Sequence, residues 1–504
     1  MAKFSLAGST ALALLFTASG AMAQVTAEDV WQSWKSMSES VGQTITTTGE
    51  ARQGDTLVID GLTLSINDPK GLIAESQVGT VKFRDTGTGT VEVTLPESYP
   101  ISMTIPPEGT DGGGPTSIKM TISQPGMLMT AGGNATDTSY DFTAPTIGID
   151  VTEVTNAEGP MNVKFNANLT GVSGRYQMTG AADAKNLDSA FNATSAVFTG
   201  NGAEDASTFA VNVSIADLKG TTKGSFLGAD MMANMAGALN AGFASNGGVS
   251  YGKTSFDVNV DDAGSQSKVT GTMDGGNVDF GLDKAQLTYA IGMKIANYTI
   301  SGSEIPMPQV NLGFGEFAFN VLMPVSKSDT PQNFSFLTKI VDLKMSDDIW
   351  ALFDPMGQLP RDPATLIIDT KGTAKLNQDI MDPAASATMQ GSFPGELNSL
   401  DVTQLLVKLA GAQVDGKGAL TFDNTDLTTF QGVPAPTGQI DVTLTGINAL
   451  LDTLVAMGIV PEDQVMGARM MLAMFAKPGD APDTLVSTIE FKDKGLYANG
   501  QRLQ

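Results

Sequence analysis

The chain contains no cysteine and no histidine among its 504 residues. Without cysteine no disulfide can form, so a core of ordinary size must supply the stability. Without either residue there can be no Ser-His-Asp or Cys-His nucleophile, no zinc site with His or Cys ligands, and no histidine general base. Any chemistry would have to rest on carboxylates, Lys, Tyr, Ser or oxygen-ligated ions.

Aromatic residues and positive charge are also scarce. Aromatic residues make up 7% of the chain, and 29 basic against 54 acidic residues give a net charge of −25. This charge repels phosphate backbones and anionic head groups, so nucleic-acid binding and electrostatic adhesion to membranes are poor interpretations. Phosphate-binding loops and nucleophile elbows are absent as motifs. We expect a protein without enzymatic activity and without a cofactor; a carboxylate-dependent hydrolase is the least favoured alternative.

The N-terminus has the pattern of a Sec-type signal peptide. A short cationic start at Met1–Lys3 precedes an apolar run from Phe4 to Thr17, and Ala21-Met-Ala23 precedes Gln24. The pattern predicts a signal peptide over residues 1–23, cleaved between Ala23 and Gln24. The alternative is an uncleaved anchor, but the run is shorter than the roughly 20 residues that span a bilayer. We expect a periplasmic or secreted protein of a Gram-negative bacterium, with no transmembrane segment after cleavage.

Residues 24–43 are predicted to contain an amphipathic helix. Thr26 is a suitable cap, acidic residues follow it, and apolar residues recur at three- and four-residue spacing. These are Val30, Trp31, Trp34, Met37 and Val41. We expect the two tryptophans to dock on the protein's own β body; a partner or membrane surface is the alternative.

Residues 44–330 alternate between apolar and polar side chains, as in Leu62–Ile66, Val91–Leu95, Phe209–Ile215 and Phe317–Val321. Period-two alternation predicts strands with one dry face. Turns are expected at Asp60-Gly61, Gly112–Pro115, Asn201-Gly202 and Asn246–Gly248, and the 56 glycines are assigned to turns and bulges. The fold class is therefore β-rich α+β: an extended, curved antiparallel sheet, or sheets, of consecutive hairpins with several docked amphipathic helices.

One helix is predicted inside this β body, over Phe226–Phe243. Its apolar residues recur every four positions and form a stripe that is rich in methionine. The stripe consists of Leu227, Met231, Met235, Leu239 and Phe243. We take Met231, Met235, Leu239 and Phe243 as a candidate hydrophobic ligand surface, with the filling of irregular core space as the more common use of such residues.

The segment from Trp350 to Pro363 is predicted to form a rigid, packed corner. Three prolines remove backbone donors and restrict φ, while its first residues are too apolar for an idle linker. Its marker residues are Trp350, Asp354, Pro355, Pro360, Arg361, Asp362 and Pro363. Because no histidine or cysteine can join the aspartates, we expect an Arg-carboxylate pair to brace the corner and not to catalyse a reaction.

Residues 331–504 are predicted to form an α+β module that continues the sheet. Helices are expected near Val402–Ala410, over Ile447–Met457, and from Pro461 to about Ala476. The third helix is apolar over most of its girth and is expected to be buried between layers.

Several segments resemble the uncharacterised bacterial family DUF2125. They are Ile349–Pro355, Leu359–Thr365, Gly438–Val442 with Leu450–Leu454, Glu490–Gly495 with Asn499–Arg502, and, near the N-terminus, Asp29–Trp34 and Gly54–Leu64. The resemblance carries over no catalytic residue. The arrangement is also similar in style to AsmA-like envelope proteins, which implies a long β surface with an apolar groove and a link to lipids. The cleavable signal pattern departs from the membrane anchor usual in those proteins.

Together these patterns predict a non-enzymatic envelope protein that binds a lipid or another hydrophobic small molecule on an apolar β surface. The alternative is a structural or protein-interaction module of the envelope. The identity of a protein partner is not predicted.

Overall fold

The computed structural model describes residues 24–40, 42–67, 71–107, 114–134, 136–181, 184–226, 234–382, 385 and 394–504. The predicted signal peptide, with Ala23 of its cleavage site, lies outside the described residues, and so does Met231 of the predicted hydrophobic surface. Within the described ranges no helix is long and apolar enough to cross a membrane.

The described strands form one antiparallel sheet of 26 strands. The first eight are β1 (Gln43–Thr46), β2 (Gly49–Gln53), β3 (Thr56–Asn67), β4 (Ile73–Asp85), β5 (Val91–Thr94), β6 (Ser98–Ile105), β7 (Thr116–Ser123) and β8 (Leu128–Gly133). The next ten are β9 (Thr138–Asn156), β10 (Gly159–Ala181), β11 (Ala184–Glu204), β12 (Ser207–Phe226), β13 (Ser245–Tyr251), β14 (Thr254–Asp262), β15 (Ser265–Leu282), β16 (Gln286–Gly302), β17 (Val310–Pro324) and β18 (Gln332–Met345). The last eight are β19 (Ala364–Leu376), β20 (Gly395–Leu409), β21 (Ala412–Asp423), β22 (Ala435–Thr445), β23 (Lys477–Pro478), β24 (Thr484–Lys492), β25 (Gly495–Ala498) and β26 (Gln501–Arg502).

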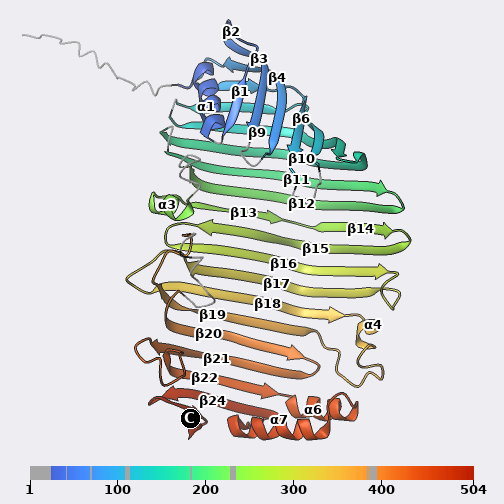
Figure 1. Cartoon of the computed structure of the whole chain (residues 1–504), viewed down its shortest axis with the longest axis vertical. Coiled ribbons are helices and arrows are strands. Elements are labelled where there is room, and N and C mark those ends of the chain that lie inside the picture. Colours follow the sequence, from blue (N-terminus) through green and yellow to red (C-terminus); the bar gives the residue numbers. More distant parts are fainter. Residues whose placement is uncertain are drawn as a thin grey trace, which may run out of the picture.

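From β9 to β22 the strands stack in chain order along the long axis of the molecule (Figure 1). Strands β13 and β14 share one row, because both pair with β12 on one side and with β15 on the other. Strand β18 pairs with both β17 and β19, so hydrogen bonding continues across residue 330. The C-terminal strands therefore extend the same sheet.

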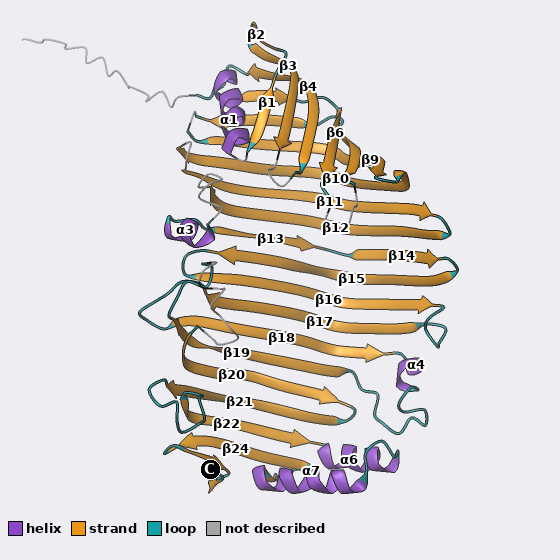
Figure 2. Cartoon of the chain, viewed as in Figure 1, coloured by secondary structure: helices purple, strands orange, loops and turns teal. Residues whose placement is uncertain are grey.

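The described helices are α1 (Ala27–Ser40), α3 (Met235–Asn240), α4 (Asp347–Trp350), α6 (Ile447–Ala456) and α7 (Glu462–Phe475). They lie at the ends and margins of the sheet (Figure 2). Helix α1 has the predicted N-terminal cap, because the backbone N–H of Asp29 donates to Thr26 Oγ1 at 3.2 Å and the N–H of Thr26 donates to the Asp29 carboxylate at 3.0 Å.

Helix α1 covers the N-terminal end of the sheet. Val30 and Trp31 are buried, and the Trp31 ring lies 5.9 Å from that of Phe83 in β4. Trp34 packs against the same ring at 5.1 Å. The prediction that the tryptophan helix docks on the protein's own β body is confirmed.

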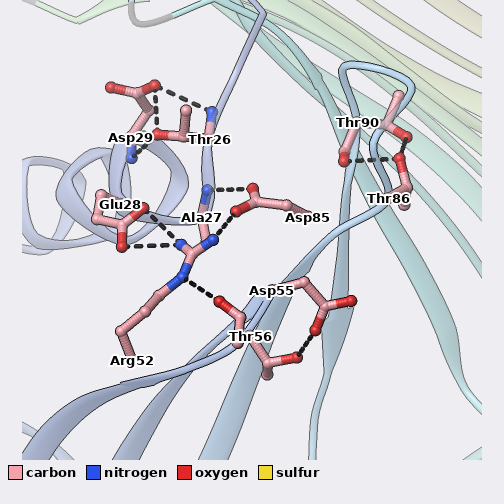
Figure 3. A network of polar contacts seen from close by, with 11 residues as sticks. Thr26, Ala27, Glu28, Asp29, Arg52, Asp55, Thr56, Asp85, Thr86 and Thr90 are labelled. Carbon is pink, nitrogen blue, oxygen red and sulfur yellow. Dashed lines mark hydrogen bonds and ion pairs between the residues drawn. The ribbon is translucent and has the colours of Figure 1, made fainter.

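A polar network fastens the start of α1 (Figure 3). Arg52 of β2 donates to the Glu28 carboxylate at 2.8 and 2.9 Å and also pairs with Asp85 of β4. The other carboxylate oxygen of Asp85 accepts the backbone N–H of Ala27 at 2.8 Å. One arginine thus joins the helix to two strands.

A line of irregular positions crosses the long strands. Gly171 in β10, Asp217 in β12, Ile295 in β16 and Asp342 in β18 all have positive φ, from 45° to 61°. At each of these positions, two successive apolar residues of the same face are three positions apart in the sequence and not two. Met293 and Ala296, on either side of Ile295, are an example. The shift keeps apolar side chains on one face on both sides of the line, so that the rings of Phe314 and Phe317 lie 6.3 Å apart although their positions differ by three.

Three helix predictions need correction. The segment near Val402–Ala410 is strand β20, in which a bulge between Val402 and Leu405 gives the apolar residues helix-like spacing. Of the helix predicted over Phe226–Phe243, residues 227–233 lie outside the described residues, Phe226 belongs to β12, and Met235–Asn240 is helical. Helix α7 forms as predicted, but it is not buried between layers, since Val465 is its only buried residue.

The predicted turns are also partly wrong. Asp60-Gly61 lies inside β3, Asn201-Gly202 inside β11, and Asn246–Gly248 inside β13. Much of Gly112–Pro115 falls outside the described residues. Many glycines therefore belong to strands, where they make room for aromatic rings. A Cβ atom on Gly200 would lie 2.7 Å from the ring of Phe165 on the neighbouring strand.

Candidate functional site

One face of the sheet is apolar over many consecutive strands. In one register row the paired residues from β15 to β18 are Phe280, Tyr289, Val321 and Phe336. The adjacent row on the same face contains Val278, Ile291 and Phe319. The intervening positions, which point to the other face, mix polar residues such as Asp279, Asn320 and Ser335 with apolar ones such as Leu322 and Leu337. The alternation predicted from the sequence thus builds one extended apolar surface.

Among the described residues, α3 packs on this face only at the ends of β15 and β16, and no second layer closes the rest of β15–β18. Phe336 is 36% exposed and Phe280 is 43% exposed, although both point to the apolar side. Isolated exposed apolar residues are common on proteins, but a contiguous apolar area marks a binding surface.

Aromatic rings form two strings across this face. In the first, ring centroids are separated by 5.9 Å between Phe256 and Tyr298, and by 6.1 Å between Tyr298 and Phe314. In the second, they are separated by 6.4 Å between Tyr289 and Phe319, and by 5.6 Å between Phe319 and Phe336. Burial raises the pKa of the Tyr298 hydroxyl above its usual value, which indicates apolar surroundings.

The second string ends at a cleft of about 1030 Å³. The end of β17, the start of β18, the end of β19, the start of β20 and the loop after β21 line it. Its apolar lining residues include Val321, Met323, Phe334, Phe336, Leu376, Ile380, Leu397 and Leu427. The apolar surface is thus hollowed where β17 and β19 end and where β18 and β20 begin.

The polar groups of the cleft are few. Glu396 is the titratable residue of its lining, and this carboxylate lies 3.5 Å from the ammonium of Lys375. The Asn424 side chain donates to the carbonyl oxygen of Leu397 at 2.7 Å. A mostly apolar pocket with a few placed polar groups is typical of sites for small hydrophobic ligands.

The described residues of the predicted methionine stripe lie beside this cleft, in a small core. Leu239 is buried with Leu282 and Val325, and Met235 and Phe243 pack against this group. Ile380 also packs there and lines the cleft as well. The geometry agrees with the core-filling interpretation of Met235, Leu239 and Phe243 and places α3 at one end of the cleft.

The corner from Trp350 to Pro363 is a structural joint. Trp350 is buried with Leu359 and Ala410, and Leu450 and Leu454 of α6 pack against them. Arg361 pairs with Asp347, which is the Arg-carboxylate brace predicted for this segment.

Asp354, at the centre of the corner, is fully buried. Its carboxylate accepts the backbone N–H groups of Gln358 at 2.8 Å and Leu359 at 2.9 Å. Burial alone would raise the pKa of this carboxyl, but these hydrogen bonds and nearby Arg361 leave the pKa below its usual value. Of the other marker residues, Pro355, Pro360 and Asp362 are exposed.

The geometry does not bring together a hard-metal site. Among the described residues no group of three or more Asp, Glu, His or Cys side chains could hold a metal ion. The sequence predicted the strand Phe317–Val321, whose last residue lines the cleft, but it did not indicate a binding site there. The cleft forms only where loop 424–434 meets strands that are distant in the chain.

Residues 353–503 match the family described as "Uncharacterized protein conserved in bacteria (DUF2125)". The match confirms the predicted DUF2125 resemblance over this segment, which includes much of the corner, the C-terminal strands and helices α6 and α7. No curated protein and no solved structure matches the chain.

Proposed function

We propose that this protein, which belongs to the DUF2125 family through residues 353–503, binds long-chain lipids or similar apolar molecules on the exposed apolar face of its sheet. The observation that carries the proposal is the cleft of about 1030 Å³ at the end of the aromatic string. The protein acts by binding and not by catalysis. The signal-peptide pattern supports a site of action in the bacterial envelope.

The size and polarity of the cleft favour an extended apolar ligand. Its volume is at the upper end of the roughly 300–1,000 Å³ found for small-molecule sites. The apolar rows continue beyond the cleft toward β15, so a chain longer than the cleft can lie along Phe336, Phe319 and Tyr289. Burial of each methylene group contributes about 0.8 kcal/mol, so affinity should rise with chain length.

Glu396 is the titratable residue of the cleft lining, and its carboxylate pairs with Lys375, which is not part of that lining. An acyl ligand can keep its polar head group in solvent at the open side of the cleft, whereas its aliphatic part lies on the apolar wall. This polarity predicts that amphipathic acyl ligands bind better than plain hydrocarbons of the same length.

Native mass spectrometry and displacement of a fluorescent fatty acid test this proposal. The purified full chain should retain acyl lipid and should bind the probe. Phe336→Asp places a charge in the cleft wall, and we expect it to weaken probe binding by at least about tenfold, since a buried unpaired charge is costly.

Asn320→Asp is the matched control, because it adds the same charge on the opposite face of β17, next to the cleft strand β18. This variant should bind the probe as the unmodified protein does. Equal loss in both variants, or absence of probe binding by the folded unmodified protein, would contradict the proposal.

A further inference from the structure

Helix α7 exposes a cluster of methionines. Met466, Met470, Met471 and Met474 are 59–64% exposed. They occupy four of the 14 positions of the helix, which lies at the C-terminal end of the sheet (Figure 2). Methionine ordinarily fills irregular core space, so this degree of exposure needs another explanation.

The opposite side of α7 is held by specific contacts. Val465 is buried, and Arg469 forms an ion pair at 2.6 Å with Asp452 of α6. At the helix end, Ser487 Oγ and Asn499 Nδ2 donate to the carbonyl oxygen of Phe475 at 2.5 and 2.9 Å. These contacts fix the rotation of the helix, so the methionines point outward.

The composition of the exposed side favours the sulfur atom over apolarity alone. Four of its five large apolar residues are methionines, the fifth being Phe475, while Leu472 is half-buried. Docking surfaces are usually anchored by Trp, Tyr and Arg, with methionine as an additional component, and Phe475 is the one aromatic residue on this side of the helix. Thioethers add the ability to bind a soft metal ion.

The spacing brings three thioethers within reach of one ion. Met470 and Met474 are four residues apart, and Met471 and Met474 are three apart, so their side chains are neighbours on the helix surface with Cβ atoms about 5–6 Å apart. Methionine has three rotatable bonds and can converge on a common point. Met466 lies one turn before Met470 on the same side.

The electrostatics at this end of α7 suit a cation. All three residues lie in the last six positions of the helix, where the macrodipole places partial negative charge. No basic residue occupies the last turn, and the whole chain has a net charge of −25. With no histidine or cysteine in the chain, the thioethers are the softest ligands it offers.

We propose that Met470, Met471 and Met474 form a binding site for a soft monovalent metal ion of the Cu(I) class, with the three Sδ atoms as ligands. Met466 is positioned to supply a fourth thioether. The site is distinct from the lipid cleft, and the proposal is independent of the proposed function.

Binding of Ag(I), added as silver nitrate in chloride-free buffer, tests the site on the full chain by isothermal titration calorimetry. Competition with a chromophoric Cu(I) chelator under anaerobic reducing conditions gives the Cu(I) affinity. We expect one site, and shifts of the 13C-labelled ε-methyl signals of Met470, Met471 and Met474. The triple variant Met470→Leu, Met471→Leu, Met474→Leu keeps the apolar surface, and we expect it to weaken binding by at least about tenfold.

Met356→Leu is the control, since this methionine is 80% exposed in the corner and is not part of α7. It should leave the affinity unchanged. Equal binding by the triple variant, or no binding by the unmodified protein, would overturn the proposal. If the unmodified protein binds no Ag(I) and self-associates, and the triple variant self-associates equally, the exposed methionine cluster of α7 is an apolar docking surface, which would also overturn the proposal.

Discussion

The N-terminal end and the middle of the sheet use the same alternating pattern in different ways. Near the N-terminus the apolar side chains of β3, β4 and β5 lie under α1, and Ile59, Val81 and Phe83 have no exposed surface. Between β15 and β18 the apolar side chains are equally regular, but among the described residues the helix α3 covers only the strand ends at Leu282 and Leu287, and Phe336 remains 36% exposed. The presence of a covering helix, and not the strand pattern, separates a core from an exposed apolar surface.

The covered end is closed by polar contacts as well as by apolar packing. Arg52 joins Glu28 of α1 to Asp85 of β4, and Asp85 accepts the first backbone N–H of the helix. At the uncovered region, rings instead pack over glycines of neighbouring strands: a Cβ atom on Gly271 would collide with the ring of Phe256. In this part of the sheet, aromatic rings thus pack against the backbone of neighbouring strands and not against a covering helix.

Truncation of matched phenylalanines should separate the two regions most strongly. Phe83→Ala removes a fully buried ring and should lower the free energy of unfolding by about 3–5 kcal/mol. Phe336→Ala removes a partly exposed ring and should cost about 1 kcal/mol, chiefly from its aromatic pairing. Chemical denaturation measures both, and equal losses would show that the face around Phe336 is covered.

Filling a strand glycine tests the packing within the uncovered layer. Gly271→Val places a side chain against the rings of Phe256 and Tyr298 and should destabilise the protein by about 1–3 kcal/mol through overpacking. Gly132→Val in β8 is the control, because its Cβ would make only ordinary contacts of 3.5 Å or more. A harmless Gly271→Val variant would contradict the proposed role of glycine.

The corner at Asp354 should give a smaller effect that is confined to acid. Its folded-state pKa is lowered, so the carboxylate stabilises the protein above its unfolded-state pKa of about 4, and this contribution is lost as the pH falls through the folded-state value. Thermal midpoints measured from pH 6 to pH 2 should fall less steeply in Asp354→Asn, which cannot titrate. Parallel curves for the two proteins would exclude this role.

The smallest effect is expected on α7. Gly467 has open space where a Cβ would lie, so Gly467→Ala should stabilise the helix by about 0.5–1 kcal/mol. Thermal unfolding measures this change. Destabilisation would mean that this side of α7 is packed, contrary to its exposure.

The sequence predicted the positions of strands and helices better than it predicted which of them pack on one another. Alternation identified strands such as Phe317–Val321, and the cap at Thr26 located α1, because both signals are local. The full length of the strands was missed because Asn201-Gly202 has turn chemistry, yet it lies in β11 beside the rings of neighbouring strands. The burial of α7 was predicted wrongly because an apolar composition shows what a helix can bury but not whether another layer is present.

The cleft could not be predicted for a different reason. It needs the end of β17, the start of β20 and loop 424–434 to meet, and these segments are separated by about a hundred residues. The spacing of residues within one strand does not show which distant segments will contact that strand. The shift in alternation at Ile295, by contrast, is present in the sequence as apolar residues three apart, and it can be sought in other long strands.

The most direct test of the uncovered face is photo-crosslinking with a long-chain fatty acid that carries a diazirine near its methyl end. The labelled peptides are then mapped by mass spectrometry. We predict labels on the cleft and the adjoining apolar rows, at Met323, Phe336 and Phe319, and none on the α1 core around Phe83 or on the polar face at Asn320. Labels spread equally over both faces, or absent from β17 and β18, would contradict the account.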